Sequence, residues 1–246
     1  MNVCVYILAG GLGKRMKSAI PKVLHKINEY SLLGNIINKI YTNIDVDIFV
    51  VTGKYHSIIK SQLENELGEN EKKINYVNQS ESLGTGHALQ CGYSTISNYD
   101  GVIVLNGDVP FININTLKNV ISNSNNDCML GICKMEFLRP EWRGHGRIVM
   151  NDNEEILRIV EEKDCNDEER EITTINGGMY YFNMNILGKY IHKLNSNNKQ
   201  NEYYITDYID IFVKNNYIVS PIYLTENEIL NVNTPEQLQL AKSILN

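Results

Sequence analysis

Long apolar runs are missing from this chain of 246 residues. No stretch approaches the roughly 18 to 20 consecutive apolar residues that a membrane-spanning helix needs. The first residues, MNVCVYILAGG, have no basic segment and no small-residue cleavage site after a long apolar stretch, so they do not form a secretory signal. We therefore expect a cytoplasmic protein that has no membrane partner.

The cysteine and histidine patterns of metal centres and disulfide frameworks are also missing. Five cysteines stand at positions 4, 91, 128, 133 and 165, an odd number without a CxxC pair. This spacing disfavours a disulfide framework and a zinc ribbon. The five histidines include no HExxH pattern. We expect the cysteines to be small buried side chains in a reducing compartment.

Acidic residues are absent from the first 28 positions, although the chain has 29 acidic and 23 basic residues and a formal net charge of −6. The net charge disfavours a general nucleic-acid surface. Uniform spacing would place roughly three acids in the first 28 positions. The same segment carries five basic residues, namely Lys14, Arg15, Lys17, Lys22 and Lys26. A basic, acid-free segment in an acidic protein indicates a local anion site.

Apolar runs and amphipathic segments alternate through the first half of the chain. Buried strands are predicted at 3–10, 46–53, 73–79, 100–108 and 127–137, and helices at 31–43, at 54–67, from residue 86 and at 114–122. Strands that alternate with helices form a parallel sheet covered on both faces. We therefore predict a Rossmann-like α/β fold with a mostly parallel central sheet.

The pattern changes after residue 140. Residues 146–164 contain two short strand-like runs around Asn151-Asp152-Asn153, which indicates a hairpin. Another strand is predicted at 173–183, followed by helices at 203–215 and 235–245 with a strand at 221–224 between them. We interpret this second part as a β-rich region inserted into the α/β fold.

The first predicted strand runs into a glycine-rich turn, Leu8-Ala9-Gly10-Gly11-Leu12-Gly13-Lys14-Arg15-Met16. Glycines let backbone N–H groups approach a phosphate, and an arginine can bind two phosphate oxygens. Met16 stands where a GxGxxG fingerprint needs glycine, and Leu8 where a Walker A loop needs glycine. The turn is therefore predicted to bind phosphate in another way. Lys14 either adds a phosphate contact or points to solvent.

Several further motifs resemble those of sugar-nucleotide pyrophosphorylases. They are PKVLH at 21–25, QSESLGTGHA at 79–88, GDVP at 107–110, GHGRI at 144–148, VEEKD at 160–164, IN at 175–176 and EYYITD at 202–207. Over roughly residues 3–240 the chain most resembles the N-terminal uridyltransferase domain of bifunctional N-acetylglucosamine-1-phosphate uridyltransferases. LAGG is shared by the broad nucleotidyltransferase superfamily, whereas PKVLH and LGTGHA are much narrower signatures.

The resemblance implies a Mg²⁺-dependent reaction of UTP with N-acetylglucosamine 1-phosphate that gives UDP-N-acetylglucosamine and pyrophosphate. The sugar phosphate attacks UTP directly, so the enzyme needs no nucleophile but has to hold two anions that repel each other. Arg15 and Lys22 would be the catalytic cations that neutralise this charge. Asp108 and Asn233 would hold Mg²⁺, a cation that prefers oxygen ligands.

The resemblance also assigns residues to the two substrates. Uridine would be bound by Leu8, Ala9, Gly10, Gly11, Gln79, Gly84 and Thr85. The sugar would be bound by Asn106, Gly107, Gly146, Glu161, Asn176 and Asn233. His87 and His145 are expected to be structural hydrogen-bonding residues. We predict one domain over 1–246, with a nucleotide-binding half to about 110, a sugar-binding half over about 111–230, and a metal-ligand segment and helix over about 231–246.

Four of these residues also suit plain structural roles. Lys22 after Pro21 is compatible with an exposed loop lysine, and Gln79 with a polar surface residue. Asp108 is compatible with a turn cap, and Asn233 with a cap of the helix that follows it.

Three departures from the family surround the expected sugar pocket. Asn106-Gly107-Asp108 replaces Tyr-Gly-Asp, Asn176-Gly177-Gly178 replaces Asn-Thr-Gly, and Gly144-His145-Gly146-Arg147 replaces Gly-Tyr-Gly-Arg. They leave open the same chemistry on glucose 1-phosphate or another sugar, or with dTTP. A non-catalytic nucleotide-sugar sensor is a further alternative, although it would not need the two cations. The family's C-terminal β-helix has no counterpart, so we expect no acetyltransferase activity, and the oligomeric state stays open.

Overall fold

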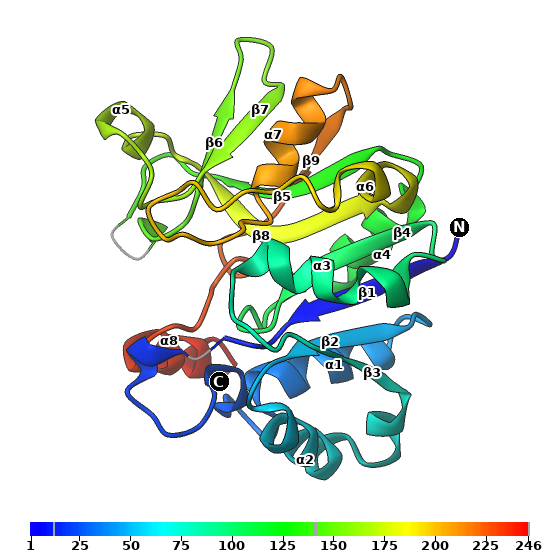
Figure 1. Cartoon of the computed structure of the whole chain (residues 1–246). Helices are drawn as coiled ribbons and strands as arrows, with labels where there is room; N and C mark the ends of the chain where they lie inside the picture. Colours follow the sequence, from blue (N-terminus) through cyan, green and yellow to red (C-terminus); the bar gives the residue numbers. More distant parts are fainter. Residues whose placement is uncertain (12, 140–141, 246) are drawn as a thin grey trace.

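A computed structural model describes residues 1–11, 13–139 and 142–245. Its central feature is a nine-stranded sheet, whose main path runs β3-β2-β1-β4-β8-β5-β9 (Figure 1). The strands are β1 (Val3–Leu8), β2 (Ile48–Thr52), β3 (Ile74–Asn78), β4 (Gly101–Asn106), β5 (Cys128–Lys134), β6 (Arg147–Met150), β7 (Ile156–Val160), β8 (Thr174–Asn183) and β9 (Val219–Tyr223).

The helices mostly follow the strands along the chain. The α-helices are α1 (Leu32–Tyr41), α2 (His56–Leu67), α3 (Thr85–Ile96), α4 (Ile114–Ser122), α5 (Asp167–Arg170), α6 (Met184–Tyr190), α7 (Asp207–Lys214) and α8 (Pro235–Leu245). The structure also describes the 3₁₀ helices η1 (Lys14–Met16), η2 (Lys22–Leu24) and η3 (Gly68–Lys73). Among the described residues, no helix is both long enough and apolar enough to cross a membrane.

The sheet is mostly parallel, which confirms the predicted fold class. β1 pairs in parallel with β2 and with β4, β2 with β3, and β5 with β9. β8 lies between β4 and β5 and is antiparallel to both. The hairpin of β6 and β7 joins this sheet where Arg147 pairs with Ile175 of β8. The hairpin is therefore attached to β8, an interior strand of one continuous sheet.

Two hydrophobic cores cover the two faces of the sheet. Val5 and Ile7 of β1 belong to the core that includes α1, α2 and α4. Cys4 and Tyr6 of the same strand belong to the core that includes α3, α6 and α7. Alternate residues of a strand point to opposite faces, so a strand covered on both sides is apolar throughout. This explains the unbroken apolar run at 3–8.

The predicted elements differ from the observed ones mainly in the second half. α4 covers the residues expected of it, but α7 begins at Asp207 rather than near 203. Tyr203 instead bonds through its backbone to Leu83 and Gly86, at 2.8 Å in each case. Neither α5 nor α6 was predicted; α6 begins where the Asn183 side chain accepts from the backbone N–H groups of Asn185 and Ile186.

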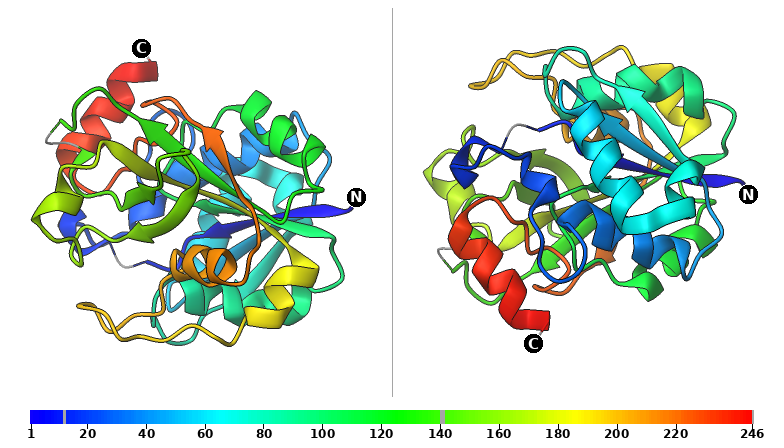
Figure 2. Two further views of the ribbon diagram at one scale, coloured as in Figure 1. Left: turned by 90° about the horizontal axis from the view of Figure 1, so that it is seen from above. Right: turned by 90° about the horizontal axis from the view of Figure 1, so that it is seen from below.

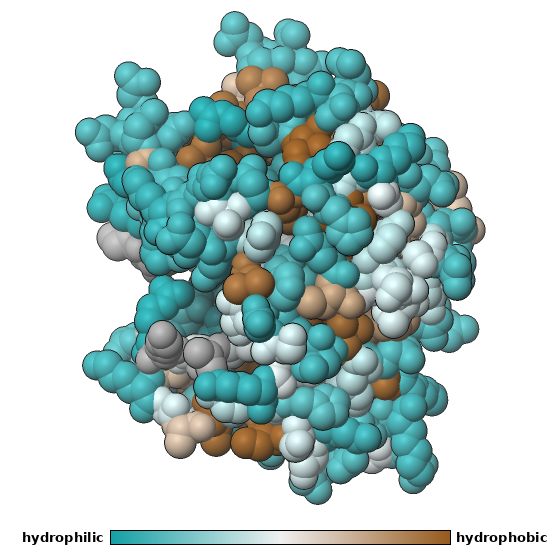
Figure 3. All heavy atoms as spheres, viewed as in Figure 1, coloured by the Kyte–Doolittle hydropathy of each residue, from teal (hydrophilic) through white to brown (hydrophobic). Residues whose placement is uncertain are grey.

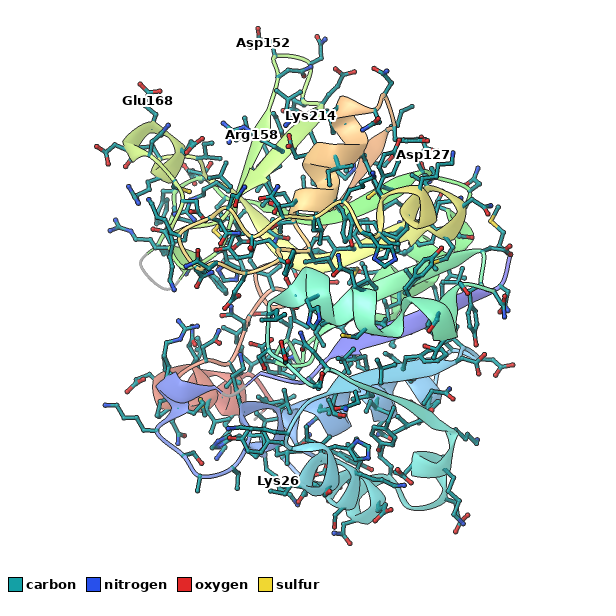
Figure 4. All side chains as sticks on the ribbon, viewed as in Figure 1. Lys26, Asp127, Asp152, Arg158, Glu168 and Lys214 are labelled. Carbon is teal, nitrogen blue, oxygen red and sulfur yellow. The ribbon has the colours of Figure 1, made fainter. Side chains whose placement is uncertain are left out.

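All five cysteines are free thiols, four of them buried and Cys91 partly exposed. Charged side chains cover the periphery: Asp152 lies at the tip of the β6–β7 hairpin, Glu168 on α5 and Lys26 at the other side of the molecule (Figure 4). In Figure 1 the hairpin lies at the top and α8 at the lower left, and in both views of Figure 2 they lie on the side away from the N-terminus. The surface is hollowed on this side, between the parts that carry α5 and α8 (Figure 3).

Candidate active site

The glycine-rich turn follows β1 and lies between the ends of β2 and β4. The Ala9 backbone N–H donates to Val51 at 3.0 Å, and Gly107 donates to Leu8 at 3.0 Å. Gly13 has a φ of +59°, and a Cβ there would come within 2.4 Å of Lys22 Cβ. The turn is therefore folded against Lys22. Leu12 and the side chain of Lys14 lie outside the described part of the turn.

Lys22 is the centre of a polar cluster. Its ammonium donates to Asp108 Oδ2 and, at 2.7 Å, to Asn233 Oδ1. The Lys22 and Asp108 side chains are only 16% and 13% exposed. The Val232 backbone N–H donates to the Asp108 carbonyl at 2.9 Å, which holds the segment of Asn233 against the end of β4. The fold thus joins three residues that are far apart in the chain.

These contacts do not match the plain structural roles of Lys22 and Asn233. Lys22 is not an exposed loop lysine, because both of its partners are side chains of other elements. The first turn of α8 is capped by Thr234, whose hydroxyl accepts from the Gln237 backbone N–H at 3.3 Å. The side chain of Asn233 is therefore available for Lys22.

The Asp108 and Asn233 oxygens suit a divalent cation, because together they already hold the ammonium of Lys22. Within the described ranges, no group of three or more histidine, cysteine, aspartate or glutamate side chains is placed to hold a metal ion. Mg²⁺ in phosphate-transfer sites is commonly bound by one or two protein oxygens together with water and substrate phosphates. The observed pair is consistent with such a site and not with an all-protein cage.

Arg15, the second predicted cation, lies apart from this cluster. It is exposed in η1 and makes no hydrogen bond or ion pair with any residue that the structure describes. The fold therefore brings Lys22, Asp108 and Asn233 together but does not place Arg15 in contact with them.

Gln79 is buried at the end of β3, with 6% of its surface exposed, so it is not a surface residue. Its amide nitrogen donates to the Gly84 carbonyl at 3.0 Å and lies 3.2 Å from His87 Nδ1. Its amide oxygen faces the glycine-rich turn, since a Cβ on Gly10 would come within 3.3 Å of it. Gln79 thus joins the loop before α3 to the predicted nucleotide turn.

Gly84 has a φ of +113°, and a Cβ there would come within 2.5 Å of the Tyr203 carbonyl oxygen. Only glycine suits this combination of backbone conformation and close approach. Next to it, the Thr85 hydroxyl accepts from the Ile205 backbone N–H at 3.0 Å. The start of α3 is thereby fixed against the segment that precedes α7.

A cavity of about 180 Å³ brings five of the predicted residues together, namely Thr85, Asn106, Gly146, Glu161 and Asn176. Gly107 is outside its lining, as are Asp108 and Asn233. Nine further residues complete the wall: Val109, Gly144, His145, Gly177, Gly178, Tyr180, Ile205, Ile229 and Asn231. Six of these nine belong to motifs that the sequence singled out, namely Val109, Gly144, His145, Gly177, Gly178 and Ile205. Asn231 had one available signal, its position two residues before Asn233.

Two polar side chains of the cavity are oriented by other residues. Asn176 donates to the Tyr180 hydroxyl at 2.7 Å and accepts from the Gly178 backbone N–H at 3.0 Å. Glu161 accepts from the Thr206 hydroxyl at 2.9 Å. Burial raises the pKa of the Glu161 carboxyl, and the nearby charges of Asp207 and Asp164 raise it further. Both side chains are held in place before any ligand binds.

His145 and Arg147 fix the loop at the cavity mouth. The ring nitrogens of His145 lie 3.1 Å from the Trp142 carbonyl and 3.4 Å from the Ile229 carbonyl. Burial lowers the pKa of His145, so the ring is neutral near pH 7. Arg147 is 1% exposed, donates to the His145 carbonyl and forms an ion pair with Glu162 at 2.7 Å. The contacts of His145 agree with the structural role expected of it.

Asp207, at the start of α7, has a pKa raised from 3.8 to about 6, chiefly by burial and then by the charges of Asp210 and Asp164. In the unfolded chain this carboxyl ionises near its ordinary value. The folded protein therefore loses stability as the pH rises from about 4 to 6, and the penalty remains above pH 6. Asp207→Asn is expected to raise the melting temperature at pH 8 by about 1–2 °C, since solvent screening limits the effect.

The measurement is a series of melting temperatures between pH 4 and 8. The gain from Asp207→Asn is expected to shrink as the pH falls and to vanish near pH 4. Asp167→Asn is the matched control, because the Asp167 side chain is fully exposed. A variant that melts lower than the wild type at pH 8 would contradict the assignment.

Comparison with known proteins places this arrangement in a family. Residues 5–226 match the nucleotidyl transferase family. The chain belongs to that family. The resemblance inferred from the sequence motifs is thereby confirmed, and so is the prediction that this nucleotidyl transferase is an enzyme.

Relatives of two kinds are similar in sequence to this nucleotidyl transferase. It is 37% identical to the "Probable UDP-N-acetylglucosamine pyrophosphorylase" of Acanthamoeba polyphaga mimivirus, over 98% of this chain and 95% of the relative. It is 36% identical to the bifunctional protein GlmU of Clostridium botulinum strain Eklund 17B, over 100% of this chain and 52% of the relative. The chain thus spans about half the length of the bifunctional relative.

The same fold occurs in solved structures. A UDP-glucose pyrophosphorylase complexed with UDP-glucose superposes with a TM-score of 0.78, at 21% identity, over 100% of this chain and 98% of that one. At this identity the match concerns the fold alone.

Proposed function

We propose that the protein transfers a uridylyl group from UTP to N-acetylglucosamine 1-phosphate, which releases pyrophosphate and forms UDP-N-acetylglucosamine. The observation that carries the proposal is the convergence of Lys22, Asp108 and Asn233 close to a polar cavity. The choice of substrate is supported by the mimiviral relative, which this chain matches over nearly its whole length.

The chemistry requires two anionic substrates to be held together. A phosphate oxygen of the sugar phosphate forms a bond to the α-phosphorus of UTP, while the bond from that phosphorus to the pyrophosphate oxygen breaks. No proton has to be removed, so the protein contributes positioning and charge. Lys22 and Arg15 would supply positive charge to the phosphates. Arg15 is exposed and unbonded to the described residues, so it is free to turn toward them.

Asp108 and Asn233 would hold Mg²⁺, which when bound neutralises phosphate charge. Lys22 has to leave these two oxygens before they can bind a metal. Its flexible four-carbon stem lets the ammonium move from the carboxylate to a phosphate oxygen. A metal on these oxygens would therefore compete with Lys22, whose ammonium lies beside the position where the phosphates would need its charge.

The remaining predicted residues divide between the two substrates. Leu8, Ala9, Gly10, Gly11, Gln79, Gly84 and Thr85 would bind uridine around the glycine-rich turn. Asn106, Gly146, Glu161 and Asn176 would bind the sugar in the cavity, whereas Gly107 is outside its lining. Glu161 accepts from Thr206 through one carboxylate oxygen, which leaves the other oxygen for a sugar hydroxyl.

The test is pyrophosphate release by the purified protein with UTP, Mg²⁺ and N-acetylglucosamine 1-phosphate. Glucose 1-phosphate, glucosamine 1-phosphate and dTTP form the comparison panel, because Asn106 and Gly177 line the cavity where the family pattern changes. We expect turnover to be fastest with UTP and the acetylated sugar. Faster turnover with another pair would change the substrate assigned to the protein but not the proposed type of reaction. Binding of UTP without turnover of any pair would support the sensor instead.

A further inference from the structure

Asn231 lies on the cavity wall with an unused amide. It makes no side-chain hydrogen bond with any described residue and is only partly exposed. Glu161, Asn176 and Tyr180 of the same wall are all bonded to other side chains. Asn106 is the other amide of the lining that lacks a side-chain bond within the described ranges. An amide that borders a cavity can donate to and accept from a ligand at once.

The backbone around Asn231 is fixed. Its neighbours Leu230 and Val232 are 2% and 0% exposed and belong to the hydrophobic core. Val232 donates to the Asp108 carbonyl at 2.9 Å, and the preceding turn is held by Glu228, which accepts from Thr116 at 2.6 Å. Asn231 is partly exposed and lines the cavity, whereas both of its neighbours are buried in the core, so its side chain is directed away from the core. Its backbone is therefore in place before any ligand arrives.

The place of Asn231 in the chain relates the cavity to the cation cluster. Asn233, two residues further on, bonds to Lys22, whereas Asn231 lines the cavity. Two residues of extended chain span at most about 7 Å. In a sugar 1-phosphate the phosphate is attached directly to the ring, so a phosphate near Lys22 would place its ring within reach of Asn231.

We infer that Asn231 is a specificity-determining residue that binds a polar substituent of the sugar ring, a hydroxyl or an acylamino group. This inference rests on the proposed function, since it assigns a role within the sugar site. A buried polar group left unpaired by the wrong sugar weakens binding, so such a residue discriminates between sugars. It complements Glu161 because an amide can also donate, whereas an ionised carboxylate only accepts.

The test compares Asn231→Leu, which keeps the branched shape and the number of heavy atoms and removes the hydrogen bonds, with Asn227→Leu. Asn227 is exposed in the same loop and outside the cavity lining, so it is the matched control. Binding of UDP and of UDP-N-acetylglucosamine is measured by calorimetry. We expect Asn231→Leu to reduce the preference for the nucleotide sugar over UDP about 5- to 10-fold, and Asn227→Leu to leave it unchanged. Melting temperatures confirm that both variants fold.

Kinetics provide the second readout. Asn231→Leu is expected to raise the KM for the sugar 1-phosphate by a similar factor and to leave the KM for UTP unchanged. An equal preference for the nucleotide sugar in the wild type and Asn231→Leu would overturn the inference. So would a wild type that binds UDP-N-acetylglucosamine no better than UDP. Absence of pyrophosphate release refutes the proposed function separately, because the binding ratio is measured without turnover.

Discussion

Lys22→Ala is expected to lower kcat for pyrophosphate release about 100- to 1000-fold, the range found when one charge-stabilising donor is removed from an active site. Lys22 is the only cation bonded to Asp108 among the residues that the structure describes. Without Lys22, less positive charge would be available to stabilise the negative charge of the reacting phosphates in the transition state. The measurement is steady-state pyrophosphate release with UTP and N-acetylglucosamine 1-phosphate at saturating Mg²⁺.

The same variant is expected to bind a divalent cation more tightly in the absence of nucleotide. Lys22 donates to both Asp108 and Asn233, so a metal has to compete with its ammonium for those oxygens. Removal of the competitor should lower the Kd for Mn²⁺, a spectroscopic substitute for Mg²⁺, by about 10-fold, a change of ~1.4 kcal/mol. Electron paramagnetic resonance of free Mn²⁺ measures this without turnover.

Lys26→Ala is the control, because Lys26 is an exposed lysine of the same basic segment (Figure 4). Neither its kcat nor its Mn²⁺ affinity should change. If Lys22→Ala lost activity and its Mn²⁺ affinity stayed that of the wild type, Lys22 would not share oxygens with the metal. A variant that retained full kcat would contradict the catalytic role itself.

Asp108→Asn is expected to lower kcat by about 100-fold or more, because an amide oxygen is a much weaker ligand for a hard cation than a carboxylate. Its effect on metal binding should be opposite to that of Lys22→Ala, with weaker Mn²⁺ binding. The substitution keeps the size of the side chain and an acceptor for Lys22, so the fold should be retained. Steady-state kinetics and Mn²⁺ titration on both variants provide the measurement.

The two variants together separate charge from metal binding. A large loss of kcat in both variants with opposite changes in Mn²⁺ affinity is expected only if Asp108 holds the cation and Lys22 competes for the same place. Asp127→Asn is the control for Asp108→Asn, because Asp127 lies on the turn before β5 and is directed toward β9, where it accepts from the Ile218 backbone N–H at 3.1 Å. If Asp108→Asn bound Mn²⁺ as the wild type does, the metal site would have to be elsewhere.

Much of the nucleotide half could be predicted from the sequence because its signals are local. The run at 3–8 is apolar on both faces, so it predicts a buried strand, and the glycines after it predict a close backbone approach. Asp108, the carboxylate that ends the buried run at 100–108, follows from the same logic. These features depend on residue type and spacing over a few positions, which a sequence displays directly.

The second half could be predicted less well because its contacts are between distant segments. α6 is only seven residues long, and it begins where Asn183 caps it. The antiparallel position of β8 between β4 and β5 is decided by packing, since an apolar strand carries no mark of its direction. Residues 203–206 have a helical pattern, but the Tyr203 backbone forms hydrogen bonds with Leu83 and Gly86 instead. Tertiary hydrogen bonds outweighed local preference there.

The sequence by itself determined the α/β fold, the basic, acid-free character of the first 28 residues and the motifs that relate the chain to nucleotidyl transferases. Only the tertiary structure decided which side chains are in contact with one another. Lys22 and Asn233 are 211 positions apart, and their contact exists because the segment before α8 is held against the end of β4. Asn231 became a candidate for the same reason, since its orientation depends on the burial of its two neighbours and not on its own identity.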